Sequence, residues 1–297
     1  MPTLAPIALF VYERIDHTKK TVEALLANDE AKYSTLYIFS DGANFHNRDK
    51  ILQLRNYLRS IDGFHEINII EAEDNYGLAR SIISGINFIF DRYEEVIVLE
   101  DDVEVSKTFL RYMNASLRQY KYVDNVGHIN SWSYFNHCTD QQIFMSKIMN
   151  CWGWATWKDQ WKIINLSPHY WHKTTSFREK YIYDLCGSGE FWPQVIMNLK
   201  GKRKTWAIFW YLSLRRHEKY SISPSISYTK NIGLDGTGQN SKIVNAYYKY
   251  KLSEDVITEW PTSDLYNDHY DNMVRKVIIN RNSSPIRFIK KCRAILY

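Results

Sequence analysis

The sequence lacks any apolar stretch that approaches the roughly 20 residues needed for a membrane-spanning helix. Its first six residues contain no basic region followed by an apolar run, so no secretory leader is predicted. Together these two absences predict a protein that stays in the cytoplasm.

Cysteine is scarce: the chain has four in 297 residues, widely spaced and without a CxxC pair. This spacing argues against both a disulfide framework and a structural zinc site. With 12 glycines and 7 prolines the chain shows no linker rich in these residues, which favours a single domain. The segment Asp235-Gly-Thr-Gly238 lacks the Lys-Ser/Thr ending of a phosphate loop and a preceding strand, so ATP chemistry is not indicated.

Aromatic residues are abundant, at 15% of the chain, and eight of the ten tryptophans lie between Trp152 and Trp210. The net charge of +5 suits an anionic ligand but does not indicate nucleic acid. Residues 287–297 hold four cations and no acid among apolar side chains. Such a tail suits either a peripheral contact with the anionic inner face of the cell membrane or an ordinary solvated helix end.

Short apolar runs alternate with helical patterns over the first hundred residues, which predicts βαβ units in a doubly wound, mostly parallel α/β sheet flanked by helices. The expected strands are 7–12, 36–40, 67–71, 96–99, 126–130 and 142–145, and the expected helices are 18–26, 50–58 and 78–90. Asp16 and Ser106 are predicted to cap helices. From Cys151 onward the pattern is irregular and rich in aromatic residues.

Polar residues follow each of the first four apolar runs, where ligands bind in open α/β sheets. These segments are Tyr12-Glu13-Arg14, Asp41-Gly42, Asn75-Tyr76-Gly77 and Glu100-Asp101-Asp102. The three carboxylates at the end of the fourth run would repel one another unless a cation held them. Since Mg²⁺ and Mn²⁺ are usually bound through one or two carboxylates plus substrate phosphates, the triplet predicts a metal–diphosphate site.

The segment Val98-Leu-Glu-Asp-Asp-Val-Glu-Val-Ser106 resembles the Glu-Asp-Asp variant of the Asp-x-Asp signature of GT-A fold glycosyltransferases. Parallels are the N-acetylglucosaminyltransferase that initiates complex N-glycans in eukaryotes and bacterial sugar transferases of capsule and O-antigen clusters. Further similar segments follow in the same order between residue 6 and about residue 240. They are Pro6 to Arg14 with His17-Thr18, Tyr37 to Gly42, Asn75 to Arg80, Trp152 to Trp157, Thr205 to Ile208 and Asn231 to Gly238.

The resemblance implies a role for each strand-end residue. Asp102 would ligate Mn²⁺ or Mg²⁺, and Glu100 and Asp101 would support the ribose and diphosphate region of a nucleotide-sugar donor. Tyr12 and Arg14 would flank the nucleotide, with Asp41 at the edge of the base. Asn75 and Tyr76 would line the donor pocket, and Arg80 would either approach phosphate or be structural.

The tryptophan-rich segment is expected to contact sugar rings, because indole faces pack well against their apolar faces. Trp152 or Trp154 would face the acceptor, and Trp157 and Trp161 would serve packing. We therefore expect a single GT-A domain with a nucleotide-sugar-binding half at residues 1–125 and an acceptor-binding and catalytic half at residues 126–260. Residues 261–297 would form a C-terminal extension.

The general base of an inverting transferase is a carboxylate near the acceptor hydroxyl. Relatives carry an acid just before the segment that resembles Thr205 to Ile208, but this chain has Lys204 there. Glu190, in a glycine-flanked loop, is the replacement candidate. Asp184 and Asp235 are alternatives.

The expected activity is metal-dependent transfer of a hexosyl or N-acetylhexosaminyl group, with UDP-sugar as the donor class that the resemblance implies. The acceptor would be a glycan or a lipid-linked glycan of surface polysaccharide assembly. Two alternatives stay open. A nucleotidyltransferase would ordinarily carry a glycine-rich loop after the first strand, and residues 12–16 contain no glycine. A catalytically silent sugar-binding scaffold would explain Lys204.

Overall fold

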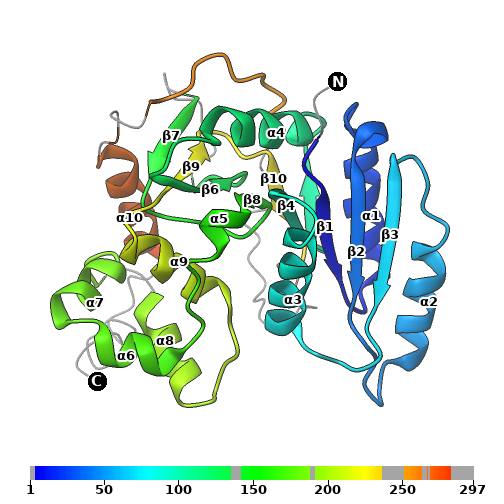
Figure 1. The fold of residues 1–297 in the computed structure, drawn as a ribbon, viewed down its shortest axis with the longest axis horizontal. Helices are drawn as coiled ribbons and strands as arrows, with labels where there is room; N and C mark the ends of the chain where they lie inside the picture. The colour runs from blue at the N-terminus through cyan, green and yellow to red at the C-terminus, as the bar shows by residue number, and fades with distance from the viewer. Residues whose placement is uncertain are drawn as a thin grey trace.

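The computed structural model describes residues 4–134, 142–187, 191–235, 251–262, 266 and 268–281. Four parallel strands, β3, β2, β1 and β4, form one half of its central sheet. The sheet has eight strands in the order β3-β2-β1-β4-β8-β6-β9-β7 (Figure 1). Its strands are β1 (Ile7–Val11), β2 (Thr35–Ser40), β3 (Glu66–Glu71), β4 (Glu95–Glu100), β6 (Val126–Asn130), β7 (Ile143–Ser146), β8 (Trp154–Trp157) and β9 (Tyr220–Pro224). A separate ribbon pairs β5 (Val103–Val105) with β10 (Thr229–Asn231) in antiparallel fashion.

Helices cover both faces of the sheet, and the prediction of an α/β fold with a mostly parallel sheet is confirmed. They are α1 (Ile15–Leu26), α2 (Arg48–Leu58), α3 (Leu78–Phe90), α4 (Phe109–Tyr120), α5 (Lys158–Trp161), α6 (Pro168–Thr174), α7 (Phe177–Tyr183), α8 (Phe191–Leu199), α9 (Ala207–Arg216) and α10 (His269–Arg281), with a 3₁₀ turn at Ala31–Tyr33. No helix in the described part of the chain is long and apolar enough to span a bilayer.

Alternation along β1 separates two hydrophobic cores. Ile7, Leu9 and Val11 pack with α1, α2 and α4 on one face, while Ala8 and Phe10 pack with α3 on the other. Successive side chains of a strand point to opposite faces, so one short apolar run supplies both cores. The sheet is therefore buried on both sides, and its polar strand ends are where a ligand can reach it.

The predicted strand positions agree closely with β1 to β4, β6 and β7, whereas both predicted helix caps are wrong. Asp16 lies inside the first turn of α1, which is preceded by Arg14 as its cap. Ser106 accepts a hydrogen bond from Phe109 N through its backbone oxygen, and Thr108 caps α4. The reason is that β5 continues the chain in extended form up to Val105, so the helix begins later than the pattern indicated.

The segment predicted to be irregular after Cys151 contains β8, a central strand that lies antiparallel between β4 and β6. Trp154 and Trp157 point to opposite faces of this strand and join different cores. Aromatic residues on both faces hide the alternation by which strands are recognised, which explains the missed strand.

His128 on β6 is fully buried, and its ring is held in the neutral form. Trp210 Nε1 donates to His128 Nδ1 at 3.0 Å, so that nitrogen must accept. The other nitrogen, Nε2, lies 3.0 Å from the backbone oxygen of Asn150, to which it must donate. Burial lowers the pKa of His128 to about 4.

Between about pH 6.5 and pH 4 the unfolded chain binds a proton on this ring and the native protein does not. We therefore expect the free energy of unfolding to fall as the pH drops through this range, by up to about 3 kcal/mol. His128→Gln, which keeps a donor and an acceptor, should remove this part of the pH dependence. Urea unfolding at several pH values measures it. His65→Gln, on an exposed residue, is the control, and an equal slope in wild type and His128→Gln would contradict the prediction.

Candidate functional site

The carboxylates of Asp101 and Asp102 lie in the tight turn between β4 and β5, at the carboxyl end of the parallel strands. The turn is held from two sides. Thr21 Oγ1 of α1 donates to Asp101 O at 2.9 Å, and Ile232 N, just after β10, donates to Asp102 O at 2.8 Å. Only 4% of Asp101 and 9% of Asp102 is exposed. The carboxylates are thus fixed in place by their backbone.

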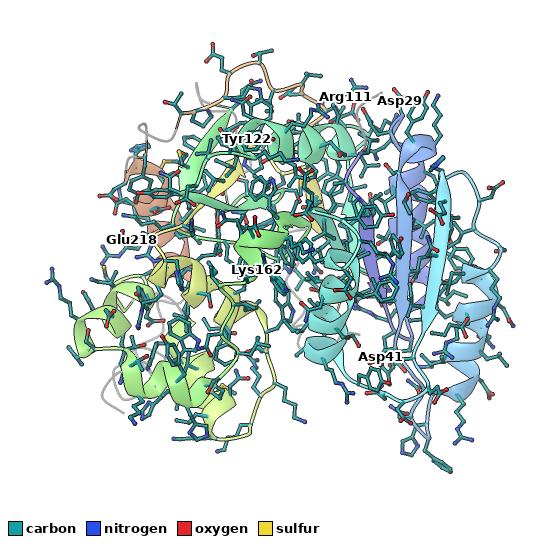
Figure 2. The ribbon with its side chains drawn as sticks, in the orientation of Figure 1. Asp29, Asp41, Arg111, Tyr122, Lys162 and Glu218 are labelled. Carbon is teal, nitrogen blue, oxygen red and sulfur yellow. The ribbon has the colours of Figure 1, made fainter. Side chains whose placement is uncertain are left out.

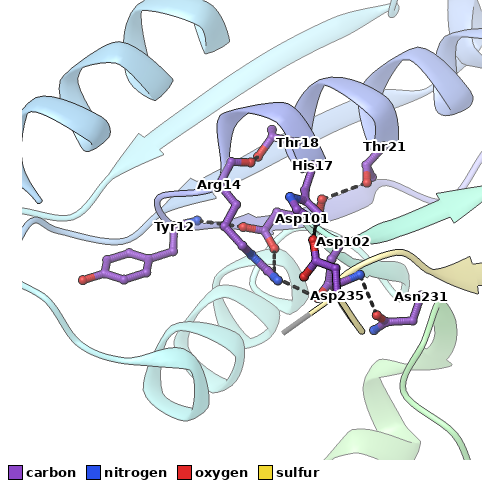
Figure 3. Close-up of polar contacts among 10 residues, drawn as sticks. Tyr12, Arg14, His17, Thr18, Thr21, Asp101, Asp102, Asn231 and Asp235 are labelled. Carbon is purple, nitrogen blue, oxygen red and sulfur yellow. Dashed lines mark hydrogen bonds and ion pairs between the residues drawn. The ribbon is translucent and has the colours of Figure 1, made fainter. Parts of the chain in front are cut away.

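Arg14, at the start of α1, bridges the two carboxylates (Figure 3). Its Nη2 is paired with Asp101 Oδ1 and lies 2.8 Å from Asp102 Oδ2. Tyr12 N donates to Asp101 Oδ2 at 3.4 Å. The remaining oxygen, Asp102 Oδ1, is buried and has no hydrogen-bond partner among the described residues. Since buried polar atoms are normally satisfied, this oxygen marks a position for a ligand.

Glu100 adds a third carboxyl group near the two that are paired with Arg14. Burial, with repulsion from Asp102 and Asp101, raises the pKa of Glu100 to about 8. Burial also raises the pKa of Asp101 to about 6, although Arg14 acts in the opposite direction. Burial acts to lower the pKa of Arg14, but the two aspartates together raise it above its usual value. Further positive charge would therefore stabilise the cluster.

A segment distant in sequence closes this cluster. A Cβ atom added at Gly233 would lie 2.1 Å from Asp102 Oδ2 and 2.7 Å from Arg14 Nη1, so only glycine fits beside the pair. Gly233 N donates to Asn231 Oδ1 at 2.9 Å. Two residues further on, Asp235 Oδ2 lies 3.1 Å from His17 Nε2 of α1. Figure 3 shows Asp235, His17 and Asn231 around Asp102.

Sequence reasoning missed the part that His17, Asn231 and Gly233 play in this site. The available signal was their place in the segments that resemble GT-A transferases, around residue 17 and from 231 onward. Asp235 was considered only as a base.

Asp41 follows β2 at the same sheet edge, opposite the edge that carries Asp29 (Figure 2). Its Oδ1 accepts from the backbone N–H groups of Gly42 at 2.9 Å and Tyr76 at 2.8 Å, and its Oδ2 accepts from Gly77 N at 2.8 Å. The carboxylate thus ties the start of the loop between β2 and α2 to the residues just before α3. Both oxygens are engaged with backbone rather than directed to an open pocket.

The other predicted donor residues lie on either side of Asp41. Tyr12 OH accepts from Asn44 Nδ2 at 2.9 Å, and burial contributes most to a raised pKa of the phenol. Asn75 Nδ2 donates to Gly42 O at 3.1 Å. Tyr76 is exposed, and the guanidinium of Arg80 stacks on its ring at 4.1 Å. The structure therefore brings Tyr12 and Arg14 to the acid cluster, and places Arg80 on α3, further along the edge.

The predicted acceptor residues Trp152 and Trp154 are separated by the fold. Trp154 is 1% exposed and packs against His128 and Trp206, with ring centroids 5.1 and 5.3 Å away, so it belongs to the core. Trp152 is partly exposed and packs edge-on against Trp132 at 4.7 Å. Of the two, Trp152 alone is placed to meet a ligand.

Asp184 is fully buried and accepts from the N–H groups of Phe191 at 2.8 Å and Trp192 at 3.0 Å, which open α8. As it stands, this carboxylate is enclosed and cannot reach an acceptor hydroxyl. Glu190 lies outside the described residues, as do residues 287–297. Lys204 is exposed.

The described side chains of the site do not form a complete metal site by themselves. No three His, Cys, Asp or Glu side chains of the described residues converge to hold a metal ion. Asp102 Oδ1 supplies one buried oxygen without a protein partner. One carboxylate with the remaining ligands from substrate phosphates and water is a usual Mg²⁺ or Mn²⁺ arrangement, so the residues fit a metal that arrives with a diphosphate.

No known family model matches the sequence, and no curated protein matches it. Solved structures do. The mannosyltransferase PcManGT from Pyrobaculum calidifontis, in complex with GDP-Man and Mn²⁺, has a TM-score of 0.35 and 11% identity over 53% of this chain and 46% of its own. TarS of S. aureus has a TM-score of 0.33 and 12% identity over 50% of this chain and 28% of its own. The chain thus spans less than half of either protein, and its function must be argued from its own residues.

Gly233→Ala tests the close contact at the acid cluster. We expect a loss of about 1–3 kcal/mol in the free energy of unfolding, because the added methyl group must push the Asp102 carboxylate and Arg14 aside. In an Asp102→Ala background, where that carboxylate is missing, the same substitution should cost less, by on the order of 1 kcal/mol. A double-mutant cycle by urea unfolding measures this coupling, and strictly additive costs would contradict it.

Proposed function

We propose that the chain is a metal-dependent GT-A glycosyltransferase that transfers a sugar from a nucleotide diphosphate donor to an acceptor with inversion. The observation that carries the proposal is Asp102 Oδ1, a buried carboxylate oxygen without a partner in the described structure, beside Arg14 at the carboxyl end of parallel strands. Open α/β sheets bind ligands at this edge. The excess of carboxylates over cations there favours a bound metal.

Asp102 would hold Mn²⁺ or Mg²⁺, which when bound neutralises the negative charge of the departing nucleoside diphosphate. Arg14 pairs with both Asp101 and Asp102 and holds their orientation. Its Nη1, also buried without a partner in the described residues, is available to an anionic donor. A guanidinium suits this role because it can bind carboxylate and phosphate at once. Glu100 and Asp101 would contact the ribose and diphosphate region.

The nucleotide would lie against Tyr12 and the loop that carries Asn44, with UDP as the expected nucleotide. We assign Asp41 a supporting part, because its oxygens hold the backbone of Tyr76 and Gly77. Asn75 and Tyr76 would then line the donor side through the loop that Asp41 fixes. The transferred group would be hexosyl or N-acetylhexosaminyl.

Trp152 is the proposed acceptor contact, and Glu190 is the proposed general base. The acceptor would be a glycan or a lipid-linked glycan in surface polysaccharide assembly, such as O-antigen or capsule, made at the cytoplasmic side. The basic tail at 287–297 would aid a peripheral membrane contact.

A silent sugar-binding scaffold is the second candidate, and a specific observation favours it. Lys204 stands where the glycosyltransferases that this sequence resembles carry an acid, and the enclosed Asp184 cannot replace that acid. Such a scaffold would bind the donor without turnover. A panel of UDP- and GDP-sugars incubated with the protein and Mn²⁺ separates the two, because release of nucleotide shows catalysis.

Calorimetry with UDP tests the site itself. We expect Mn²⁺ to tighten UDP binding by about tenfold or more, equivalent to about 1.4 kcal/mol, because the ion bridges Asp102 and the diphosphate. Asp102→Asn should abolish this gain. Glu104→Gln is the matched control, since Glu104 lies on the adjoining β5 and pairs with Lys230 at 2.8 Å. UDP binding that ignores Mn²⁺, or an Asp102→Asn variant that behaves as wild type, would refute the proposal.

A further inference from the structure

A cavity of about 510 Å³ lies between α3 and the connection from α8 to α9, within the range of small-molecule sites. Arg80 and Ile83 of α3 form one wall. Arg203, Lys204 and Trp206 belong to the opposite wall. Lys204, which stands where the resemblance predicts an acid, therefore lines this cavity.

The charge of this cavity has one sign. Arg80, Arg203 and Lys204 line it, and no Asp or Glu does. None of the three cations forms an ion pair in the described structure, unlike Arg14 and Arg59, which are paired with carboxylates. Three cations around one cavity repel one another and favour an anion between them.

The rest of the lining is mostly apolar. Ile83 and Leu166 line the cavity together with Trp206 and Phe209, which are themselves largely buried. The Trp206 ring packs on Trp154 at 5.3 Å, so this wall continues into the core and is rigid. A simple inorganic anion would leave the apolar wall in water.

Both cationic walls are held in position before any ligand binds. Thr205 N donates to Asn198 Oδ1 at 3.0 Å, and Asn198 Nδ2 donates to Thr205 Oγ1 at 2.7 Å. These two bonds fix the connection that carries Arg203 and Lys204. Across the cavity, Arg80 stacks on Tyr76, whose backbone is tied to Asp41. Preorganised cations lose less entropy when they bind an anion.

We propose that this cavity binds an amphipathic organic phosphate, with the phosphate among Arg80, Arg203 and Lys204 and an apolar chain against Ile83 and Phe209. Its identification as the acceptor of the transferase rests on the proposed function, but the binding itself does not. Lys204 then serves acceptor binding, which gives a reason for a cation where an acid is expected. Arg80 belongs to this ligand rather than to the donor.

Calorimetry on the full chain with octyl phosphate, kept below its micelle-forming concentration, tests the proposal. Octyl phosphate should bind at least about tenfold more tightly than either 1-octanol or inorganic phosphate, because each of these lacks one of the two contacts. Arg80→Gln combined with Lys204→Gln should weaken octyl phosphate binding by about tenfold or more. Lys202→Gln, an exposed lysine of the same connection that does not line the cavity, should leave it unchanged.

Equal affinity for octyl phosphate and octanol, or for octyl phosphate and inorganic phosphate, would overturn the proposal. So would an equal loss in the double variant and in Lys202→Gln.

Mn²⁺-dependent UDP binding by the double variant keeps this test separate from the proposed function. It should match wild type, and a loss there as large as for octyl phosphate would assign the cations to the donor and overturn the proposal. If octyl phosphate binds as expected and UDP does not bind to wild type, the proposed function fails and the cavity assignment stands.

Discussion

The repulsion among Glu100, Asp101 and Asp102 is the constraint around which the site is organised. β4 ends at Glu100, and the turn that carries Asp101 and Asp102 is pinned to α1 and to the residues after β10. Arg14 offsets part of the charge, and Asp102 Oδ1 is left buried and unpaired in the described structure. A protein that keeps this arrangement without a ligand bears an electrostatic cost. A metal bound with a diphosphate would offset that cost, which is the basis of the proposed nucleotide-sugar donor site.

Much of the parallel half of the fold could be predicted from sequence because its strands are buried on both faces and read as continuous apolar runs. The same logic placed Asp102 and Arg14 at one sheet edge. Strand β8 could not be predicted, because Trp154 and Trp157 serve opposite cores and mask the alternation. The ribbon of β5 and β10 has three residues per strand, too few for a pattern. Gly233 reaches Asp102 only through that ribbon, so its role is a consequence of tertiary structure and could not be predicted from the spacing of residues.

Side-chain roles were harder to predict than positions. Asp41 was expected to meet the base of the nucleotide, yet its oxygens bind three backbone N–H groups. Asp184 caps α8 from a buried position, and Trp154 lies in the core. A carboxylate at a strand end serves equally well as ligand or as loop support, and sequence alone does not tell which N–H groups lie within its reach. Asp41 also links the end of β2 to the start of α3, which carries Arg80, so the two proposed ligand sites share one scaffold.

A crystal structure of the protein soaked with UDP and Mn²⁺ tests the central claim most directly, because manganese can be located by its anomalous scattering. The account predicts a manganese peak within about 2.2 Å of a carboxylate oxygen of Asp102, with phosphate oxygens of the nucleotide on the same ion. Manganese bound elsewhere, or UDP bound with Asp102 still paired to Arg14 alone, would contradict it.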